Sequence, residues 1–291
     1  MNHRTWPPAL CAVLLFSPLA AWSDTSATAA LTNFGWRLVD LNPDDGIAPA
    51  LSFNDAPWFT GVGANAAEGP WPDGVSLPPQ SANASRSYGA YFSRFPQLAR
   101  EAATAHASAA VMLSGDVAAQ TYSAVASGQS RNTRADPLFS SSFFANYIVN
   151  SQAPLPGLPP MTLTPFTAVV WSGELLLQAS TTLPIRGNRF EQAGANAVLE
   201  LRDRATNERL ASFSEFIATR RYRAESVSRA LPLSLTWENA TASAATAWFD
   251  TRLTAYGNSF QPVPEPGTWA LTLCGVALLA GVARRSRARG G

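Results

Sequence analysis

One short segment carries side-chain oxygens at a spacing suited to a metal ion. Asp40, Asn42 and Asp44 alternate along the chain, and Gly46 follows them. Carboxylate and amide oxygens that alternate before a glycine are the ligands with which a protein loop wraps Ca²⁺. The glycine comes one residue late for an EF-hand loop, however, and Leu51 stands where a bidentate Glu would be needed. The segment is therefore a calcium candidate, with an Asx turn between two strands as its alternative.

Hydrolytic chemistry has weaker local support. His106 is the one histidine of residues 24–262, which excludes a site built from several histidines. No Gly-x-Ser-x-Gly elbow accompanies it, and two carboxylates that meet only in the folded chain leave no local pattern. A secreted hydrolase is thus the third of three hypotheses. It requires a cleft that gathers His106 or two acidic residues.

Two tryptophans offer binding chemistry. Trp58 and Trp71 fall in residues 55–81, a segment rich in proline and glycine that we expect to be an irregular loop. Aromatic rings on a loop can stack on sugar rings, so this pair is the carbohydrate-binding candidate; its alternative is burial of both rings over the core. Residues 61–66 match a dinucleotide-binding fingerprint by letter only, because no clean strand precedes them and no helix pattern follows.

Composition excludes several classes of protein. Residues 24–262 carry 16 arginines, no lysine and 19 acidic residues. Their net charge of about −3 argues against a nucleic-acid partner. Both cysteines, Cys11 and Cys274, lie in apolar stretches near the two ends of the chain, so the central region has no disulfide or thiolate metal site. We expect no cofactor.

The elements that position these residues are expected to be strands. Residues 24–262 show short alternating or β-branched runs separated by turn residues, with little helical periodicity. In residues 246–256, Asp250 and Arg252 fall on one face, and Phe249 and Leu253 fall on the other, as in a sheet with one face toward water. Residues 96–111 are alanine-rich and fit either a strand or a helix. The pattern predicts an all-β fold, namely a β-sandwich, with a jelly roll as one form of it.

Twelve strands are expected from these patterns. They cover residues 32–41, 50–54, 85–95, 109–114, 118–126, 143–149, 166–171, 174–179, 197–203, 210–218, 231–238 and 246–256.

Both ends of the chain differ from this central region. Residues 1–23 have the make-up of a secretory signal peptide, with Arg4 before the apolar residues 9–16 and small residues before Asp24. At the other end, Pro264, Glu265 and Pro266 form an extended segment, because each proline fixes its own φ and disfavours helix before it.

An apolar run and a basic cluster complete the C-terminal tail. Residues 269–283 are uncharged and predict a transmembrane helix of about 22 Å, against a hydrocarbon core of roughly 30 Å. The positive-inside rule leaves the following arginines in the cytoplasm and the domain before them outside. These arginines are Arg284, Arg285, Arg287 and Arg289.

The tail as a whole resembles the PEP-CTERM sorting signal of Gram-negative bacteria. The likeness rests on the Pro264–Glu265–Pro266 motif, the apolar helix and the arginine cluster, in that order. It implies recognition by an exosortase, cleavage near the motif, and a final location at the cell surface or in the extracellular matrix. The alternative is an ordinary single-span membrane protein.

The sequence therefore predicts three parts: a signal peptide over residues 1–23, an exported β-rich domain over 24–262, and a sorting signal over 263–291. It predicts a non-enzymatic surface or matrix protein connected with biofilm or exopolysaccharide. The expected partners are an exosortase, the inner membrane as a transient anchor, and extracellular polysaccharide. A carbohydrate-binding module is the alternative function.

Overall fold

The computed structural model describes residues 23–53, 57–70, 80–91, 95–132, 139–150, 161–182, 191–220 and 223–260, together with Gly275 and Leu278. Trp22–Pro262 forms one compact unit. Residues 1–22 of the predicted signal peptide lie outside the described residues, whereas its last residue, Ser23, begins a strand; the sorting tail is also outside them except for Gly275 and Leu278. Within the described ranges, no helix has the length and apolar character needed to cross a membrane.

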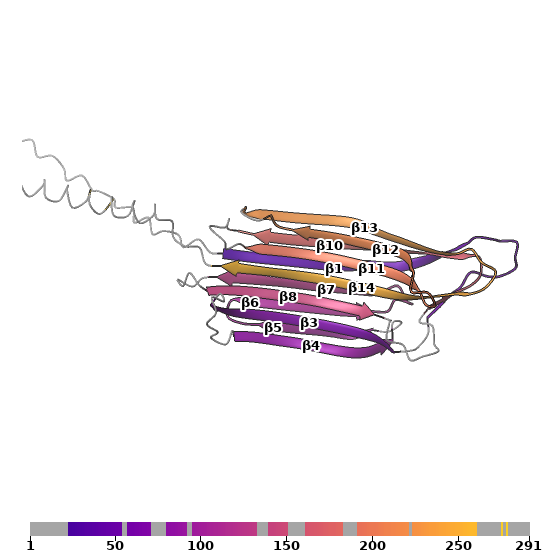
Figure 1. Ribbon diagram of the computed structural model, residues 1–291, viewed down its shortest axis with the longest axis horizontal. Helices are drawn as coiled ribbons and strands as arrows, with labels where there is room; N and C mark the ends of the chain where they lie inside the picture. Colours follow the sequence, from indigo (N-terminus) through magenta and orange to yellow (C-terminus); the bar gives the residue numbers. More distant parts are fainter. Residues whose placement is uncertain are drawn as a thin grey trace, which may run out of the picture. The chain divides into compact units, whose positions relative to one another are not determined.

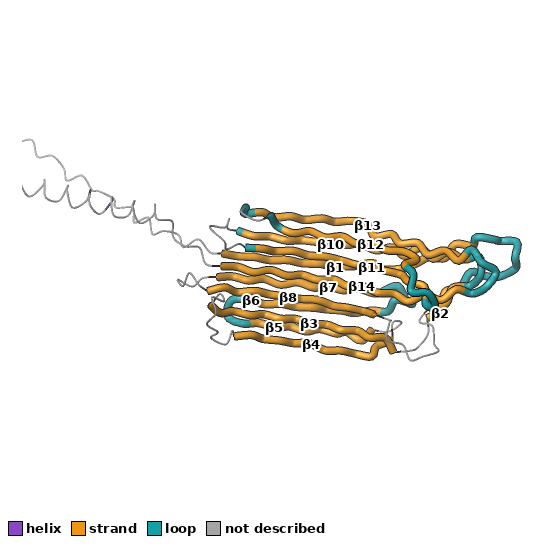
Figure 2. Tube along the Cα trace, viewed as in Figure 1, coloured by secondary structure: helices purple, strands orange, loops and turns teal. Residues whose placement is uncertain are grey.

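The described part of the compact unit consists of strands joined by short turns, as Figure 2 shows. The all-β prediction is therefore confirmed. The strands are β1 Ser23–Asp40, β2 Leu51–Phe53, β3 Pro57–Pro70, β4 Gln80–Tyr91, β5 Phe95–Ala103, β6 Ala107–Gly115, β7 Tyr122–Asn132, β8 Phe139–Asn150, β9 Met161–Leu163, β10 Thr167–Thr181, β11 Gln192–Asp203, β12 Arg209–Ala218, β13 Glu225–Asn239 and β14 Ala245–Phe260.

These strands form two antiparallel sheets whose inner faces lie against each other (Figure 1). The six-stranded sheet has the order β13-β10-β1-β7-β6-β5. The eight-stranded sheet has the order β12-β11-β14-β8-β3-β4, and the short strands β9 and β2 extend it beside β14. Across the core, β1 contacts β14, β7 contacts β8, and β6 contacts β3. Each sheet thus has one face toward the shared core and one face turned outward.

The chain passes between the two sheets at both edges. It crosses from β4 to β5 at one edge and from β12 to β13 at the opposite edge. Strands β1 and β14 face each other in the middle, and the start of β1 lies at the same end as the finish of β14. This follows because Ser130 pairs with Thr25 of β1 and its Oγ lies 2.7 Å from Ser259 Oγ of β14. Ser23 and Phe260 therefore lie at the same end of the domain.

The predicted alternation of β14 is largely confirmed. Phe249, Thr251 and Leu253 are fully buried, whereas Arg252 on the other face is exposed. Trp248 departs from the pattern, because the Arg202 guanidinium lies over its ring at 5.7 Å and the ring is buried. One face of this strand thus belongs to the core and the other to the outer surface.

An aromatic cluster around Trp171 joins the two sheets. Its ring stacks on Phe34 with centroids 5.5 Å apart and contacts Phe249 at 5.6 Å. Phe53 and Trp36 approach it at 6.3 and 6.5 Å. Large aromatic side chains bury much area, so this cluster holds β1, β2, β10 and β14 together.

One expectation about local structure needs correction, and one open choice is decided. Residues 55–81 are not one irregular loop, since β3 runs through Pro57–Pro70 and pairs with β4 as a hairpin. The reason is that Val62, Ala64 and Ala66 alternate on the buried face, where small side chains suffice. The run of residues 61–66 is therefore a strand and not a nucleotide-binding turn. Residues 96–111, which fitted either strand or helix, lie largely in strands β5 and β6.

Candidate functional site

Most of the predicted binding and sorting residues lie outside the part of the chain whose side chains the structure describes. Trp58 is the second residue of β3, and its side chain is outside the described part. Trp71, the Pro264–Glu265–Pro266 motif and the four C-terminal arginines lie outside the described residues altogether. Carbohydrate binding by the two tryptophans and sorting by the tail therefore stay predictions.

The predicted calcium loop forms hydrogen-bonded turns. Asp40 Oδ1 accepts the backbone N–H of Asn42 at 2.9 Å, and Asp45 Oδ1 accepts that of Ile47 at 2.7 Å. These are the Asx turns that the sequence offered as the alternative. In the ranges that the structure describes, no three or more His, Cys, Asp or Glu side chains gather as a metal site. Calcium binding through Asp40, Asn42 and Asp44 stays a prediction without added support.

The structure brings His106 to a buried carboxylate. His106 Nδ1 lies 2.9 Å from Glu68 Oε2, which also accepts the backbone N–H of His106 at 2.9 Å. The Glu68 side chain is 4% exposed. Its strand neighbour is Ser141 on β8, which belongs to a buried group of hydroxyls. Histidine, glutamate and serine thus meet at one end of the core, although they are far apart in the sequence.

The three buried serines form a closed hydrogen-bond network of their own. Ser130, Ser141 and Ser259 place their Oγ atoms 2.7 to 2.9 Å from one another, and each residue is at most 1% exposed. Buried hydroxyls are stable when they satisfy one another in this way. A serine nucleophile must reach a substrate, and none of these three does. The network therefore holds the sheets together at this end.

The outer face of the eight-stranded sheet gathers aromatic and amide side chains. In one row, Asn65 of β3 pairs with Phe144 of β8, which pairs with Tyr256 of β14. The adjacent row runs through β8, β14, β11 and β12. We name the surface made by these two rows the aromatic–amide face. Its residues are Asn65, Phe144, Tyr256, Gly194, Asn146, Thr254, Asn196 and Phe216.

Glycines allow two of these side chains to lie flat on the sheet. A Cβ atom on Gly194 would come within 2.5 Å of the Tyr256 ring, so the ring covers Gly194. In the same way, a Cβ on Gly63 would come within 2.7 Å of Asn146 Oδ1. The tyrosine ring and the asparagine amide therefore lie along the sheet and make the surface flat.

Two features of the aromatic–amide face bear on ligand binding. Phe144 and Phe216 are 44% and 54% exposed, which is unusual for phenylalanine. Between them along the sheet, Asn196 Oδ1 is buried and accepts no hydrogen bond from the described residues. A buried acceptor of this kind needs a donor to offset its desolvation. Exposed rings beside an amide acceptor suit a ligand with both apolar faces and hydroxyl groups.

Charged residues border this face on one side. Glu200 of β11 lies opposite Asp250 of β14 and forms ion pairs with Arg202 at 2.8 Å and Arg209 at 3.0 Å. Partial burial raises the pKa of the Asp250 carboxyl, and nearby Arg252 opposes that rise. Acidic and basic groups are mixed here, so this border is no strong attractor for either sign of charge.

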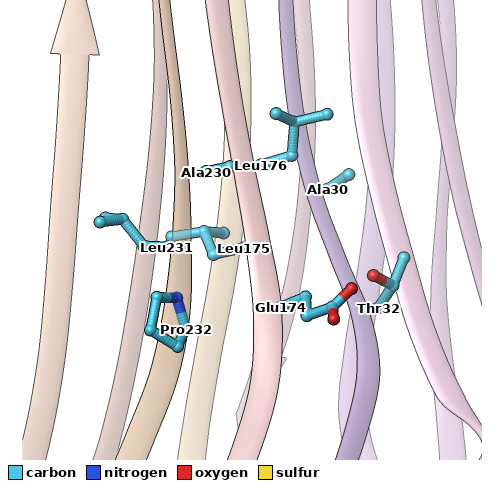
Figure 3. A pocket seen from close by; sticks show the side chains of 8 residues that line it. All are labelled: Ala30, Thr32, Glu174, Leu175, Leu176, Ala230, Leu231 and Pro232. Carbon is cyan, nitrogen blue, oxygen red and sulfur yellow. The ribbon is translucent and has the colours of Figure 1, made fainter.

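The outer face of the six-stranded sheet carries a different feature, an open hollow of about 520 Å³ (Figure 3). Leu176, Leu231 and Pro232 give it an apolar wall, and the Glu174 carboxylate lies at one side. Glu174 already accepts a hydrogen bond from Asn33 at 3.1 Å, next to the irregular pairing of β1. The hollow has no aromatic lining.

Sequence reasoning missed the aromatic–amide face, because its members come from five strands. The sequence predicted that one face of β14 is turned toward water, and this face supplies Tyr256 and Thr254. Their neighbours depend on strand register, which no local pattern reveals. No protein-family model, curated protein or solved structure matches the chain. Function is therefore argued from this geometry.

Proposed function

We propose that the protein is a non-enzymatic exported surface or matrix protein, sorted through its C-terminal tail by an exosortase. The observation that carries the proposal is that Ser23 and Phe260 lie at the same end of the domain. A leader before Ser23 and a tail after Phe260 are then both attached at that end, and the proposal assigns display to the rest of the domain. The Pro264–Glu265–Pro266 motif, the apolar residues 269–283 and the arginines that follow support the sorting step.

The display domain is, in this proposal, a β-sandwich. Contacts between the two inner faces and the shared aromatic cluster support this class. Consecutive strands β5, β6 and β7 lie side by side in one sheet, which favours a sandwich with a meander over a jelly roll.

Sorting is tested by changing Pro264, Glu265 and Pro266 to alanine in a host that has an exosortase. We expect the changed protein to stay in the inner-membrane fraction, while the unchanged protein reaches the surface or the medium. Alanines at residues 261–263, directly before the motif, are the matched control and leave sorting intact. An unchanged surface fraction after loss of the motif contradicts the proposal.

A second candidate function is a carbohydrate-binding module, and the aromatic–amide face favours it. Exposed rings next to an unpartnered amide are suited to sugars, which present apolar faces and hydroxyls together. The predicted pair of tryptophans is tested by Trp58→Ala and Trp71→Ala in a polysaccharide pull-down. Equal retention of these variants and the unchanged chain removes the pair from the site.

The non-enzymatic assignment is supported by the burial of the serine network beside Glu68 and His106. Among the described residues, Glu200 and Asp250 are two carboxylates that lie opposite each other on the outer face, so they are the pair to test for hydrolysis. Release of reducing sugar by the unchanged chain, lost in Glu200→Gln, would replace this assignment with a glycoside hydrolase.

A further inference from the structure

We propose that the aromatic–amide face is the binding site for an uncharged polysaccharide, which lies across the strands from β8 to β12. This inference rests on the carbohydrate-binding candidate above and specifies where the sugar binds and which class of sugar it is. Three steps support it: the absence of charge on the face, its flatness, and the unpartnered acceptor at its floor.

The face carries no charged side chain in its two rows. A third row beside them, Ala67–Ser142–Asn258–Gln192, is also uncharged. Acidic polysaccharides and nucleic acids need cationic partners, and the nearest arginines are already paired with Glu200 or beside Asp250. The surface therefore selects a neutral polymer.

Its flat aromatic rings match the apolar faces of sugar rings. Tyr256 lies over Gly194 and is only partly buried, so part of its ring is exposed. Phe144 is its direct neighbour on β8, and Phe216 lies two strands away from β14 on β12. Rings placed on β8, β14 and β12 form a track that crosses the strands. A chain of several sugar units can contact all three at once.

The amide between these rings supplies a hydrogen-bond acceptor for the sugar. Asn196 lies between Thr254 and Phe216 in its row, and its Oδ1 accepts no hydrogen bond from the described residues. Because this atom is buried in the unbound chain, a sugar hydroxyl can donate to it only after neighbouring side chains move aside. An aliphatic ligand or a lipid tail would leave it unsatisfied, so the acceptor favours a hydroxylated ligand over a purely apolar one.

The experiment is affinity electrophoresis of the purified full-length chain in detergent. The gels contain hydroxyethyl cellulose, galactomannan or dextran as neutral polymers, or alginate as an anionic one. We expect at least one neutral polymer, and not alginate, to retard the chain. Phe144→Ala and Phe216→Ala should each weaken that retardation at least tenfold. Met112→Ala is the matched control, because Met112 is equally exposed at 42% on the other sheet, and it should change nothing.

A second variant separates a binding role from a structural one. Asn196→Leu removes the unpartnered acceptor and keeps similar bulk. A merely structural asparagine would lower the unfolding midpoint when replaced. A ligand-binding asparagine with an unsatisfied atom should instead weaken retardation about tenfold while the midpoint stays level or rises.

Each contrary outcome has a separate meaning. If Phe144→Ala and Phe216→Ala are retarded as strongly as the unchanged chain, this site is overturned, and the protein binds carbohydrate through another surface. Retardation by alginate alone overturns the neutral ligand. If no polymer binds, both the site and the carbohydrate-binding function are wrong. The sorting proposal is unaffected, because the variant of the Pro264–Glu265–Pro266 motif tests it separately. A dimer that becomes a monomer in Phe144→Ala shows that a second copy covers the face, and this also overturns the inference.

Discussion

The two outer faces of the domain rest on the same core but differ in chemistry. The six-stranded sheet presents mainly serine, threonine, alanine and glutamine, with Met112 and an aliphatic hollow as its apolar features. The eight-stranded sheet presents flat aromatic rings, amides and a buried acceptor without a partner. This difference between the two faces is the basis of the binding site proposed on the eight-stranded sheet.

The largest expected effect comes from the core that both faces share. Trp171→Ala removes the centre of the aromatic cluster and should cost about 3–5 kcal/mol of unfolding free energy. Both faces should be lost together, since Trp171 contacts residues of both sheets. Urea unfolding followed by circular dichroism measures the change. Leu210→Ala, at an exposed site, should stay within about 0.5 kcal/mol. A loss below about 1 kcal/mol for Trp171→Ala would mean that the sheets are held together elsewhere.

The next effect separates the two faces. The double variant Phe144→Ala with Phe216→Ala should lower affinity for the neutral polymer about a hundredfold, which is about 2.7 kcal/mol. The reverse change, Met112→Tyr, adds a ring to the six-stranded sheet and should create no second site, because no amide acceptor accompanies it. Affinity electrophoresis measures both. A gain of binding in Met112→Tyr would show that any exposed ring suffices.

A smaller effect is expected from the flatness of the ring. Gly194→Ala keeps every aromatic residue, but its methyl group would meet the Tyr256 ring and push it out of line. We expect a loss of affinity of about threefold to fivefold, which is below about 1 kcal/mol. Ser228→Ala, at an exposed position of the six-stranded sheet, is the control and should bind like the unchanged chain. Full affinity in Gly194→Ala would show that the orientation of this ring is unimportant.

The smallest effect concerns the charged border. Burial raises the pKa of Asp250, so the folded protein holds this proton more tightly than the unfolded chain does. Its contribution to stability is therefore present below the unfolded pKa and is lost as pH rises through the folded pKa. Asp250→Asn should raise the free energy of unfolding at pH 7 by less than about 1 kcal/mol. The difference should vanish below about pH 3.

Thermal unfolding of Asp250→Asn at a series of pH values tests this sign. Glu200→Gln is the matched control. It should lower stability slightly at pH 7, because it removes the charge that holds Arg202 and Arg209. Destabilisation by Asp250→Asn at pH 7 would mean that its arginine neighbours outweigh its burial.

Local patterns predicted the all-β class and the faces of β14, because alternation has a period that any strand keeps. They failed for β3, where Gly61, Gly63 and Ala64 carry no hydrophobic signal although the strand is half buried. They also placed the start of β1 at residue 32, since the earlier residues Thr25 and Ser26 read as polar. Thr25 is buried only because it lies beside Ser130 of β7.

The aromatic–amide face could not be predicted from the sequence for a similar reason. Phe144 and Tyr256 are 112 positions apart in the sequence, and only the register between β8 and β14 makes them neighbours. The role of Gly194 is equally hidden, because it depends on the ring that covers it from another strand. Single strands can be inferred from their own residues, whereas a site assembled across strands requires the pairing.

The most direct test of the difference between the two faces is hydroxyl-radical footprinting of the full-length chain. It is carried out with the neutral polymer that retards the chain, and with alginate at equal mass to match radical scavenging. The account predicts that oxidation of Phe144, Tyr256 and Phe216 falls with the neutral polymer alone, while oxidation of Met112 stays constant. Protection of Met112, or equal oxidation of the three rings in both polymers, would contradict it.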